Sequence, residues 1–249
     1  MDLVNGILVE EEKGSLDKDA MKSAVGVRVS TAPIRGAGAG SSPSTALHAI
    51  RVRPIPFAVG KRLVVRHHYL HSMPGGTGLT FGVFLGACLR GVIVFGAGPA
   101  FAHRLVEGAT PDDCLTLTRL WLSDALPRNS ESRVLGIVCR ALARHTGVRF
   151  LVSYADPSRG HLGTIYQAAG WLYTGLSYPM PLYDLGDGRP RHSRSLAQVF
   201  SSHSLEGLRA VGIPVKLVPQ AGKHRYIRFL DRSWESKLRV PVLPYPKED

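Results

Sequence analysis

The chain has 249 residues, of which 44% are hydrophobic and 20% are charged, a composition typical of a globular protein large enough to bury a core. No apolar stretch reaches the ~20 residues that a membrane-spanning helix needs, and the acidic N-terminus does not match a secretion signal. We therefore expect a cytoplasmic protein without a membrane partner. The three cysteines lie far apart within apolar segments, which favours buried thiols over disulfides or a zinc site.

The net charge of +12 indicates a polyanionic partner. Residues 1–46 carry six acidic and five basic residues, so residues 47–249 hold 26 basic residues against 13 acidic ones. The positive charge therefore belongs to the body of the protein, and we expect it to bind nucleic acid, with double-stranded DNA as the main partner. A basic surface that only keeps the protein soluble is the alternative.

Composition divides the chain into three segments. Residues 1–46 include the run RGAGAGSSPS and show no hydrophobic period, so we expect a disordered or low-complexity tail. Residues 47–178 carry the clearest helix and strand patterns and form the predicted core. Residues 179–249 are basic and rich in proline, and we expect two short helices and a final strand that complete the same domain.

The first half of the core predicts mainly strands. IRVRPIP (50–56) predicts a short edge strand interrupted by its prolines, and AVGKRLVVRHHYL (58–70) has apolar residues at helical spacing. LTFGVFL (79–85) and CLRGVIVF (88–95) predict a hairpin, and CLTLTRLWL (114–122) predicts a further strand. The hydrophobic pattern therefore indicates a strand-rich beginning with one helix.

The second half alternates helices and strands. Asn129 or Ser130 can cap an amphipathic helix, and FLVSYA (150–155) is apolar on both faces, as in a parallel sheet. A short helix at 161–169 and a strand from Trp171 follow. The complete order predicts an α/β protein with a mixed sheet.

An aspartate and a tyrosine flank the turn after the strand 150–155. Asp156 ends this strand and Tyr166 lies on the next helix. A carboxylate can take a proton from a nucleophile, and a phenol with an ordinary pKa of about 10 can protonate a leaving group. Two roles without chemistry explain the same residues equally well: an Asx turn before Pro157 and a half-buried tyrosine with its hydroxyl in water.

Several histidines gather around the end of the first helix. His67 and His71 have the spacing of metal ligands on a helix, and His68 and His161 add further imidazoles. No carboxylate or cysteine accompanies them at ligand spacing. We therefore expect no metal, and we favour histidines that position the substrate or carry protons.

Cations alternate with aromatic residues in KHRYIRFL (223–230), as in a strand that presents cations to phosphates. We predict nucleic-acid contacts from this strand and from arginines before it: Arg191, Arg194, Lys223, His224, Arg225 and Arg228. A solvated edge strand kept soluble by its charge is the alternative. Helices beginning at Ser195 and Ser204 could form a helix-turn-helix, which ordinary helix packing explains as well.

The element order, with IYQAAGW after a strand and a short helix, resembles the GNAT acyltransferase fold. The resemblance implies a mixed sheet whose parallel strands four and five splay apart around the acyl donor, and a tyrosine, here Tyr166, that protonates the departing group. The segment LPRNSESR (126–133) differs from the glycine-rich phosphate loop of that family because it has no glycine. Phosphates of a donor could still be held by nearby polar residues: Arg119, Arg128, Asn129, Ser130 and Arg133.

Longer stretches resemble the Mom family of phage DNA-modification proteins over roughly residues 50–247. In order, they are HHYLHSMP, LTLTRLWLSDALPRNSESR, SYADPSRGHLGTIYQAAGWLYTG, KHRYIRFL and LPYPK. The resemblance implies conversion of adenine in DNA to its carbamoylmethyl derivative, which shields phage DNA from restriction. It also implies catalytic roles for Asp156, Tyr166 and Tyr69 in a catalytic core at residues 47–178.

A duplex hides the amine of adenine, so the base must be flipped into a pocket. We expect one of three rings to stack on the base: Trp121, Tyr154 or Trp171. We expect further contacts with the substrate from His67, His68 and Ser153. The glycine-free loop and a charge large enough for two nucleic acids favour glycyl-tRNA over acetyl-CoA as the donor. A GNAT N-acetyltransferase acting on a small amine or a protein is one alternative, and a non-enzymatic nucleic-acid-binding protein is the other.

Overall fold

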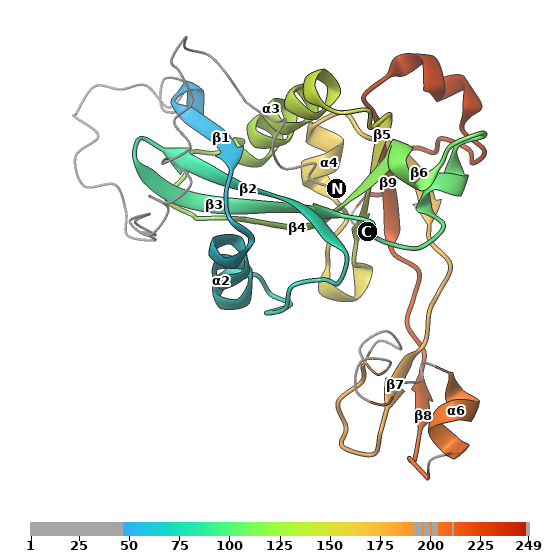
Figure 1. Cartoon of the computed structure of the whole chain (residues 1–249). Coiled ribbons are helices and arrows are strands. Elements are labelled where there is room, and N and C mark those ends of the chain that lie inside the picture. Colours follow the sequence, from blue (N-terminus) through green and yellow to red (C-terminus); the bar gives the residue numbers. More distant parts are fainter. Residues whose placement is uncertain (1–46, 192–195, 197–199, 201–203, 211, 248–249) are drawn as a thin grey trace.

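The computed structural model describes residues 47–191, 196, 200, 204–210 and 212–247. Their main body is a mixed seven-stranded sheet in the order β1-β2-β3-β4-β5-β9-β6 (Figure 1). Its strands are Ile50–Pro54 (β1), Thr77–Leu85 (β2), Cys88–Gly96 (β3), Cys114–Leu122 (β4), Phe150–Ala155 (β5), Leu172–Leu176 (β6) and His224–Phe229 (β9). The predicted tail and Arg194 lie outside the described residues.

Helices cover both faces of this sheet. The helix α2 (Phe57–His67) packs on one face, and α3 (Ser130–His145) and α4 (Thr164–Ala168) lie on the other (Figure 1). Short 3-10 helices add further cover: Ala102–Leu105 (η3), Pro111–Asp113 (η4), Pro157–Arg159 (η5) and Arg232–Lys237 (η6). No helix in the described part of the chain is long and apolar enough to cross a membrane.

The apolar periods of the sequence build the core. Val134, Leu135 and Val138 of α3 join the largest buried cluster, while Leu63 and Val64 of α2 join a second cluster on the opposite face. β5 is buried on both faces and pairs in parallel with β4, as its unbroken apolar run predicts. The predicted mixed sheet is therefore confirmed.

Two predicted helices are longer than those in the structure. The first helix ends at His67, because His68 is already extended, with a φ of −78° and a ψ of 138°. The helix predicted at 161–169 is confined to Thr164–Ala168 and follows the separate 3-10 turn η5. Both corrections concern the residues beside the candidate site.

The alternative reading of KHRYIRFL as a solvated edge strand is wrong. β9 lies inside the sheet and pairs with both β5 and β6. Tyr226 is buried against α4 through the ring of Tyr166, and Ile227 and Phe229 are buried in a cluster beneath η3 and η6. An apolar environment on both faces explains why a strand so rich in cations is interior.

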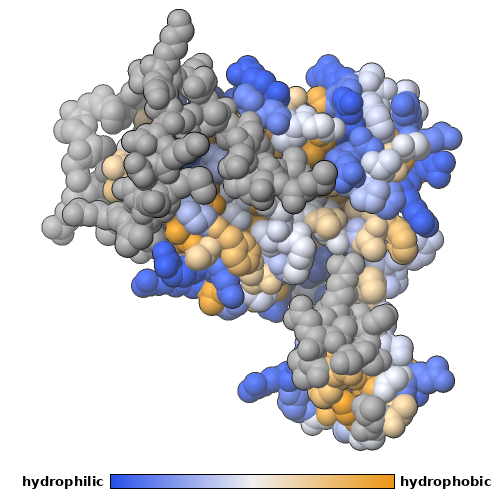
Figure 2. All heavy atoms as spheres, in the orientation of Figure 1, coloured by the Kyte–Doolittle hydropathy of each residue, from blue (hydrophilic) through white to orange (hydrophobic). Residues whose placement is uncertain are grey.

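Between β6 and β9 the chain leaves the main body and forms a small lobe (Figure 1). Its described elements are the antiparallel pair Leu182–Asp184 (β7) and Lys216–Val218 (β8), and the helix Leu205–Ala210 (α6). Hydrophobic side chains of the lobe lie between hydrophilic flanks (Figure 2).

The two connections of the lobe are joined where they meet the sheet. The backbone N–H of Ser177 donates to the carbonyl of Lys223 at 2.8 Å, and the N–H of Lys223 donates to Ser177 Oγ at 3.0 Å. A Cβ at Gly222 would lie 2.1 Å from the Ser177 carbonyl oxygen, so this close approach requires glycine.

Candidate active site

The two parallel strands separate at a defined point. The β4–β5 ladder ends at the pair Leu117–Ser153, although both strands continue beyond it. The neighbouring β3–β4 ladder skips Thr118, which is the mark of a β-bulge. Because a bulge bends its strand, β4 turns away from β5 beyond Leu117. We call the region between the two unpaired strand ends the opening.

A buried phenol lies at this opening. Tyr166 Oη is 2.7 Å from Ser153 Oγ, which is also 3.1 Å from the Leu117 carbonyl oxygen. The Tyr166 ring packs against Trp171 and Tyr226, with centroids 5.2 Å away in both cases. Burial raises the pKa of Tyr166 to about 12, despite the hydrogen bond with Ser153. Tyr166 is therefore a neutral proton donor at physiological pH.

Ser153 has a different place from the one predicted. It was expected to contact the substrate, but its exposed fraction is only 1%. Its hydroxyl instead connects the end of the strand ladder to Tyr166. Ser153 therefore fixes the position of the phenol.

The carboxylate at the end of β5 has two sets of partners. Asp156 Oδ1 accepts hydrogen bonds from Ser158 N at 3.0 Å and Ser158 Oγ at 2.6 Å, which is the Asx turn considered from the sequence. Asp156 Oδ2 lies 3.0 Å from Lys223 Nζ. Burial raises the pKa of Asp156, but hydrogen bonds from Ser158 and Lys223 outweigh burial and hold it below its usual value. Asp156 is therefore ionised at neutral pH.

Three aromatic rings form a second group of side chains at the opening, on the α2 side of the sheet. The rings of His68 and Tyr69 stack at 4.4 Å, and the edge of His161 meets Tyr69 at 5.2 Å. His68 Nδ1 accepts a hydrogen bond from the Leu70 N–H, so the ring proton is on Nε2. Burial, followed by the charge of Arg119, lowers the pKa of His68 to about 4. His68 therefore offers a neutral N–H donor.

Tyr69 links the two sides of the sheet. Burial and then the negative charge of Asp156 raise the pKa of Tyr69, and Tyr69 in turn contributes to the raised pKa of Tyr166. Contacts also place Tyr69 near Asp156, because the His161 ring meets Tyr69 at 5.2 Å and the backbone N–H of His161 donates to the Asp156 carbonyl at 3.1 Å. Tyr69 follows α2 and Tyr166 belongs to α4, on the opposite face. The opening thus brings both tyrosines and Asp156 to one region. Asp156 and Tyr166 share no hydrogen-bond partner, because Asp156 contacts Ser158 and Lys223 whereas Tyr166 contacts Ser153.

Arg119, predicted to hold the donor, supports this second group of side chains. Its Nε donates to the Ser72 carbonyl at 2.9 Å and its Nη1 to the Thr118 carbonyl at 2.7 Å. The guanidinium thereby fixes the segment after α2 against the bulge of β4.

The loop before α3 differs from a phosphate-binding loop in its hydrogen bonds as well as its sequence. Asn129 adopts a left-handed conformation with a φ of 66° and makes no side-chain cap, and Ser130 bonds back to the Pro127 carbonyl through both its N–H and its hydroxyl. Asn129 is thus the N-terminal cap residue, which is one of the two predicted positions, but it caps α3 without a side-chain hydrogen bond. Arg128 is exposed, and Arg133 Nε is buried with no hydrogen-bond partner in the described part of the chain. These arginines could attract phosphate, but the N–H of Ser130 is already engaged.

Two of the rings predicted to contact the base lie elsewhere. Trp171 has an exposed fraction of 0%, so the prediction that it stacks on a base is wrong. Tyr154 faces away from Ser153 along β5 and packs in the cluster under η3 and η6. The structure therefore does not bring Tyr154 to the phenol of Tyr166.

The histidines do not share one helical face. His67 stacks on Trp121 at 4.2 Å, whereas His71 lies beyond the helix with a φ of 46° and its Nδ1 is 3.0 Å from the Val65 carbonyl oxygen. The helical spacing considered for a metal is therefore absent. Within the described ranges, no group of three or more His, Cys, Asp or Glu side chains could hold a metal ion.

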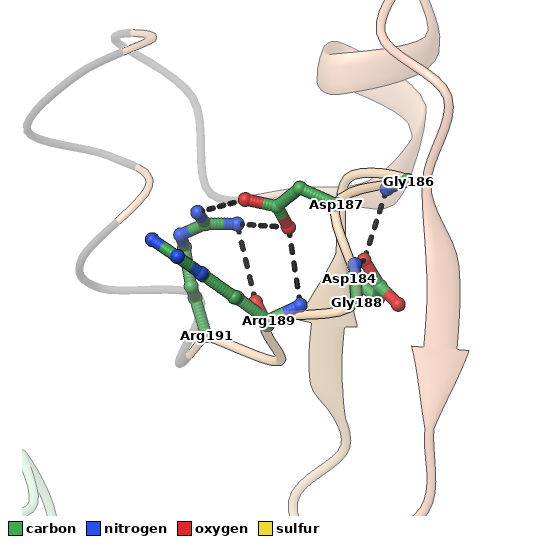
Figure 3. Close-up of polar contacts among 6 residues, drawn as sticks. All are labelled: Asp184, Gly186, Asp187, Gly188, Arg189 and Arg191. Carbon is green, nitrogen blue, oxygen red and sulfur yellow. Dashed lines mark hydrogen bonds and ion pairs between the residues drawn. The ribbon is translucent and has the colours of Figure 1, made fainter.

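Most of the predicted phosphate-binding cations have internal partners. Arg191 pairs with Asp187 in the lobe (Figure 3), and Arg225 donates to Thr174 Oγ1 at 2.8 Å and to the Thr174 carbonyl at 2.9 Å. His224 is buried, which excludes the predicted phosphate contact without rearrangement. Its Nδ1 is 2.9 Å from the hydroxyl of Tyr173.

Sequence reasoning missed the partner of the carboxylate. Lys223 was assigned to nucleic acid, but it lies at Asp156 because β9 enters the sheet beside β5. His161 was expected to position the substrate or carry protons, and it packs on Tyr69. Spacing gave no signal for either contact, because the residues come from separate elements.

The strand order and the separation of β4 from β5 define a GNAT-like fold. Similar solved structures include Arabidopsis thaliana NAA60 with acetyl-CoA, which is 10% identical with a TM-score of 0.44 and covers 72% of this chain and 99% of that chain. The putative acetyltransferase yncA of Salmonella typhimurium with acetyl-CoA is 11% identical with a TM-score of 0.42, covering 74% and 95%.

The model of the Mom protein family matches residues 49–247, and the chain belongs to this family. Methylcarbamoylase mom of Escherichia phage Mu is 29% identical over 208 residues, which cover 80% of this chain and 84% of that protein. The resemblance inferred from the sequence motifs is confirmed.

Proposed function

We propose that this protein is a DNA-modifying transferase that converts adenine to its carbamoylmethyl derivative and so shields the DNA from restriction. The observation that carries the proposal is the separation of β4 from β5 beyond the pair Leu117–Ser153, where Ser153 contacts the buried phenol of Tyr166. Membership of the Mom family and similarity to methylcarbamoylase mom support the same chemistry.

The α2 side of the opening suits a flipped adenine. Tyr69 is 44% exposed and His161 is exposed, so these rings could stack on the base. The Nε2–H of His68 could donate to a ring nitrogen. The exocyclic amine is a poor nucleophile and becomes acidic as its new bond forms, so ionised Asp156 would accept the released proton at that stage.

The opposite side of the opening suits the leaving group. Tyr166 is neutral because its pKa is raised to about 12, so it can donate a proton to a departing oxygen or sulfur atom. Its contact with Ser153 fixes the phenol before the donor arrives. Tyr166 would thus act as the general acid and Ser153 as its positioning residue.

Glycyl-tRNA is the donor that we favour. The adenine amine attacks the glycyl ester, gives a proton to Asp156, and expels the tRNA hydroxyl, which takes a proton from Tyr166. The glycyl amine then attacks the ring carbon through a five-membered ring. The bond from that carbon to the original nitrogen breaks and a proton moves to this nitrogen, so it becomes the carboxamide. All atoms of the glycyl-adenine intermediate remain in the product.

Mass spectrometry of nucleosides tests the reaction. Purified full-length protein, duplex DNA labelled with ¹⁵N at the exocyclic amine of adenine, and glycyl-tRNA should give a glycinamide adduct whose carboxamide carries the label. A label that stays attached to the ring excludes the rearrangement. Activity with acetyl-CoA and without tRNA identifies an ordinary N-acetyltransferase, and DNA binding without any adduct identifies a non-enzymatic protein.

A further inference from the structure

A cavity lies at the C-terminal end of β9, away from Asp156. It has a volume of about 160 Å³ and is bordered by the second half of α3, the turn before β6 and the end of β9. Three of its lining residues carry hydrogen-bond donors: Arg140, Trp171 and Arg228. The other lining residues are apolar, glycine or cysteine, so no carboxylate borders the cavity.

The indole of Trp171 is the least satisfied of these donors. Its exposed fraction is 0%, and its Nε1 has no hydrogen-bond partner among the described residues. A buried donor without a partner is costly, so such a group is rare unless a ligand or water satisfies it. Trp171 also lines the cavity, so a group bound there would change the surroundings of this indole.

The two arginines add charge at the same place. Arg140 is exposed and has no hydrogen bond or ion pair among the described residues, and its Nη1 would lie 3.4 Å from a Cβ at Gly136. Arg228 Nη1 donates to the Gly170 carbonyl at 3.0 Å. Both arginines act electrostatically on Cys139, whose thiol pKa burial nevertheless raises to about 11. Cys139 lines the cavity, so both positive charges act there.

We propose that this cavity is an anion site that binds a phosphate group of a nucleic acid. Two guanidinium groups and no carboxylate line the cavity among the described residues, which favours an anion, and guanidinium groups bind phosphate through paired hydrogen bonds. The net charge of +12 favours a nucleic acid as the source of the phosphate. DNA and tRNA offer the same group. The site goes beyond the proposed reaction and would exist even if that reaction were different.

Nuclear magnetic resonance of the indole groups tests the site directly. In the full-length ¹⁵N-labelled protein, the Trp171 signal is the one missing from the Trp171→Phe variant. Titration with inorganic phosphate should shift this signal. The same titration with duplex DNA or with tRNA then identifies the source, and a shift with either supports the site. If phosphate, duplex DNA and tRNA all leave the Trp171 signal unchanged, the proposal is overturned.

Affinity measurements provide the matched control. Arg140→Gln should weaken phosphate binding about tenfold, the loss expected for a charged hydrogen bond, and should lower the salt dependence of nucleic-acid binding by about one phosphate contact. Arg144→Gln removes the same charge from an exposed position one turn further along α3, outside the cavity. It should leave the phosphate affinity and the salt dependence unchanged. Equal effects of the two substitutions would refute the site, whether or not the protein forms the adenine adduct.

Discussion

The two ends of β9 carry similar cations and use them differently. At the N-terminal end, Lys223 pairs with Asp156 and Arg225 bonds to Thr174. At the C-terminal end, Arg228 borders a cavity together with Arg140, which has no partner among the described residues. Cations near the opening are therefore engaged within the fold, whereas those at the far end can meet an external anion.

This difference shows that a basic pattern does not locate a phosphate site by itself. The motif KHRYIRFL predicted one continuous binding strand, but its cations serve the sheet at one end and a cavity at the other. The neighbours of a cation decide its role, since ion pairs and hydrogen bonds within the fold leave it fewer donors for phosphate.

The sharpest test concerns chemistry at the opening. Tyr166→Phe should lower the rate of adduct formation by about 100-fold or more, because general acid catalysis contributes at least that much. The variant should stay folded, since the ring still packs against Trp171 and Tyr226. Adduct formation per minute, measured by mass spectrometry, reports the loss.

Tyr226→Phe is the matched control for this substitution. Tyr226 is also buried and packs on Tyr166, but its hydroxyl bonds to the Leu162 carbonyl and not to Ser153. The rate of adduct formation by the Tyr226→Phe variant should remain close to that of the unmodified protein. If both variants lose activity equally, Tyr166 acts through packing and the assignment of a general acid fails.

At the N-terminal end of β9, we expect a smaller effect, on the stability of the fold. Arg225→Gln removes two hydrogen bonds to Thr174 and should lower the free energy of unfolding by about 1–3 kcal/mol. Denaturant unfolding measures this change. Phosphate affinity should not change, in contrast to Arg140→Gln. Weakened phosphate binding by folded Arg225→Gln protein would contradict the division between the two ends.

The smallest effect concerns the ion pair at Asp156. Lys223→Met should lower the free energy of unfolding at neutral pH by about 1 kcal/mol, because the lysine side chain is 35% exposed and solvent screens the pair. The pKa of Asp156 should rise, since hydrogen bonding and charge from Lys223 now lower it.

The pH dependence gives the sign of this effect. Because the pKa of Asp156 is lowered in the folded state, its contribution to stability is present at neutral pH and is lost as the pH falls through that pKa. The two proteins should therefore become equally stable in acid. A difference that persists after Asp156 is protonated would mean that Lys223 acts by packing alone.

Much of the fold was predictable because it depends on local patterns. The period of α3, the alternation in β4 and the unbroken apolar run of β5 each specify one element from neighbouring residues. Family motifs also gave the resemblance to Mom proteins. Asp156 and Tyr166 could be selected from the sequence, although neither spacing nor composition could decide between their catalytic and structural roles.

The sequence by itself determined the elements, the excess of positive charge and the family, since these follow from residue types and their order. The tertiary structure decided which groups meet: β9 entered the sheet between β5 and β6, brought Lys223 to Asp156, and placed Arg228 beside the buried indole of Trp171. Such contacts join residues that are distant in sequence, and their energies depend on burial and distance, which only the folded chain sets.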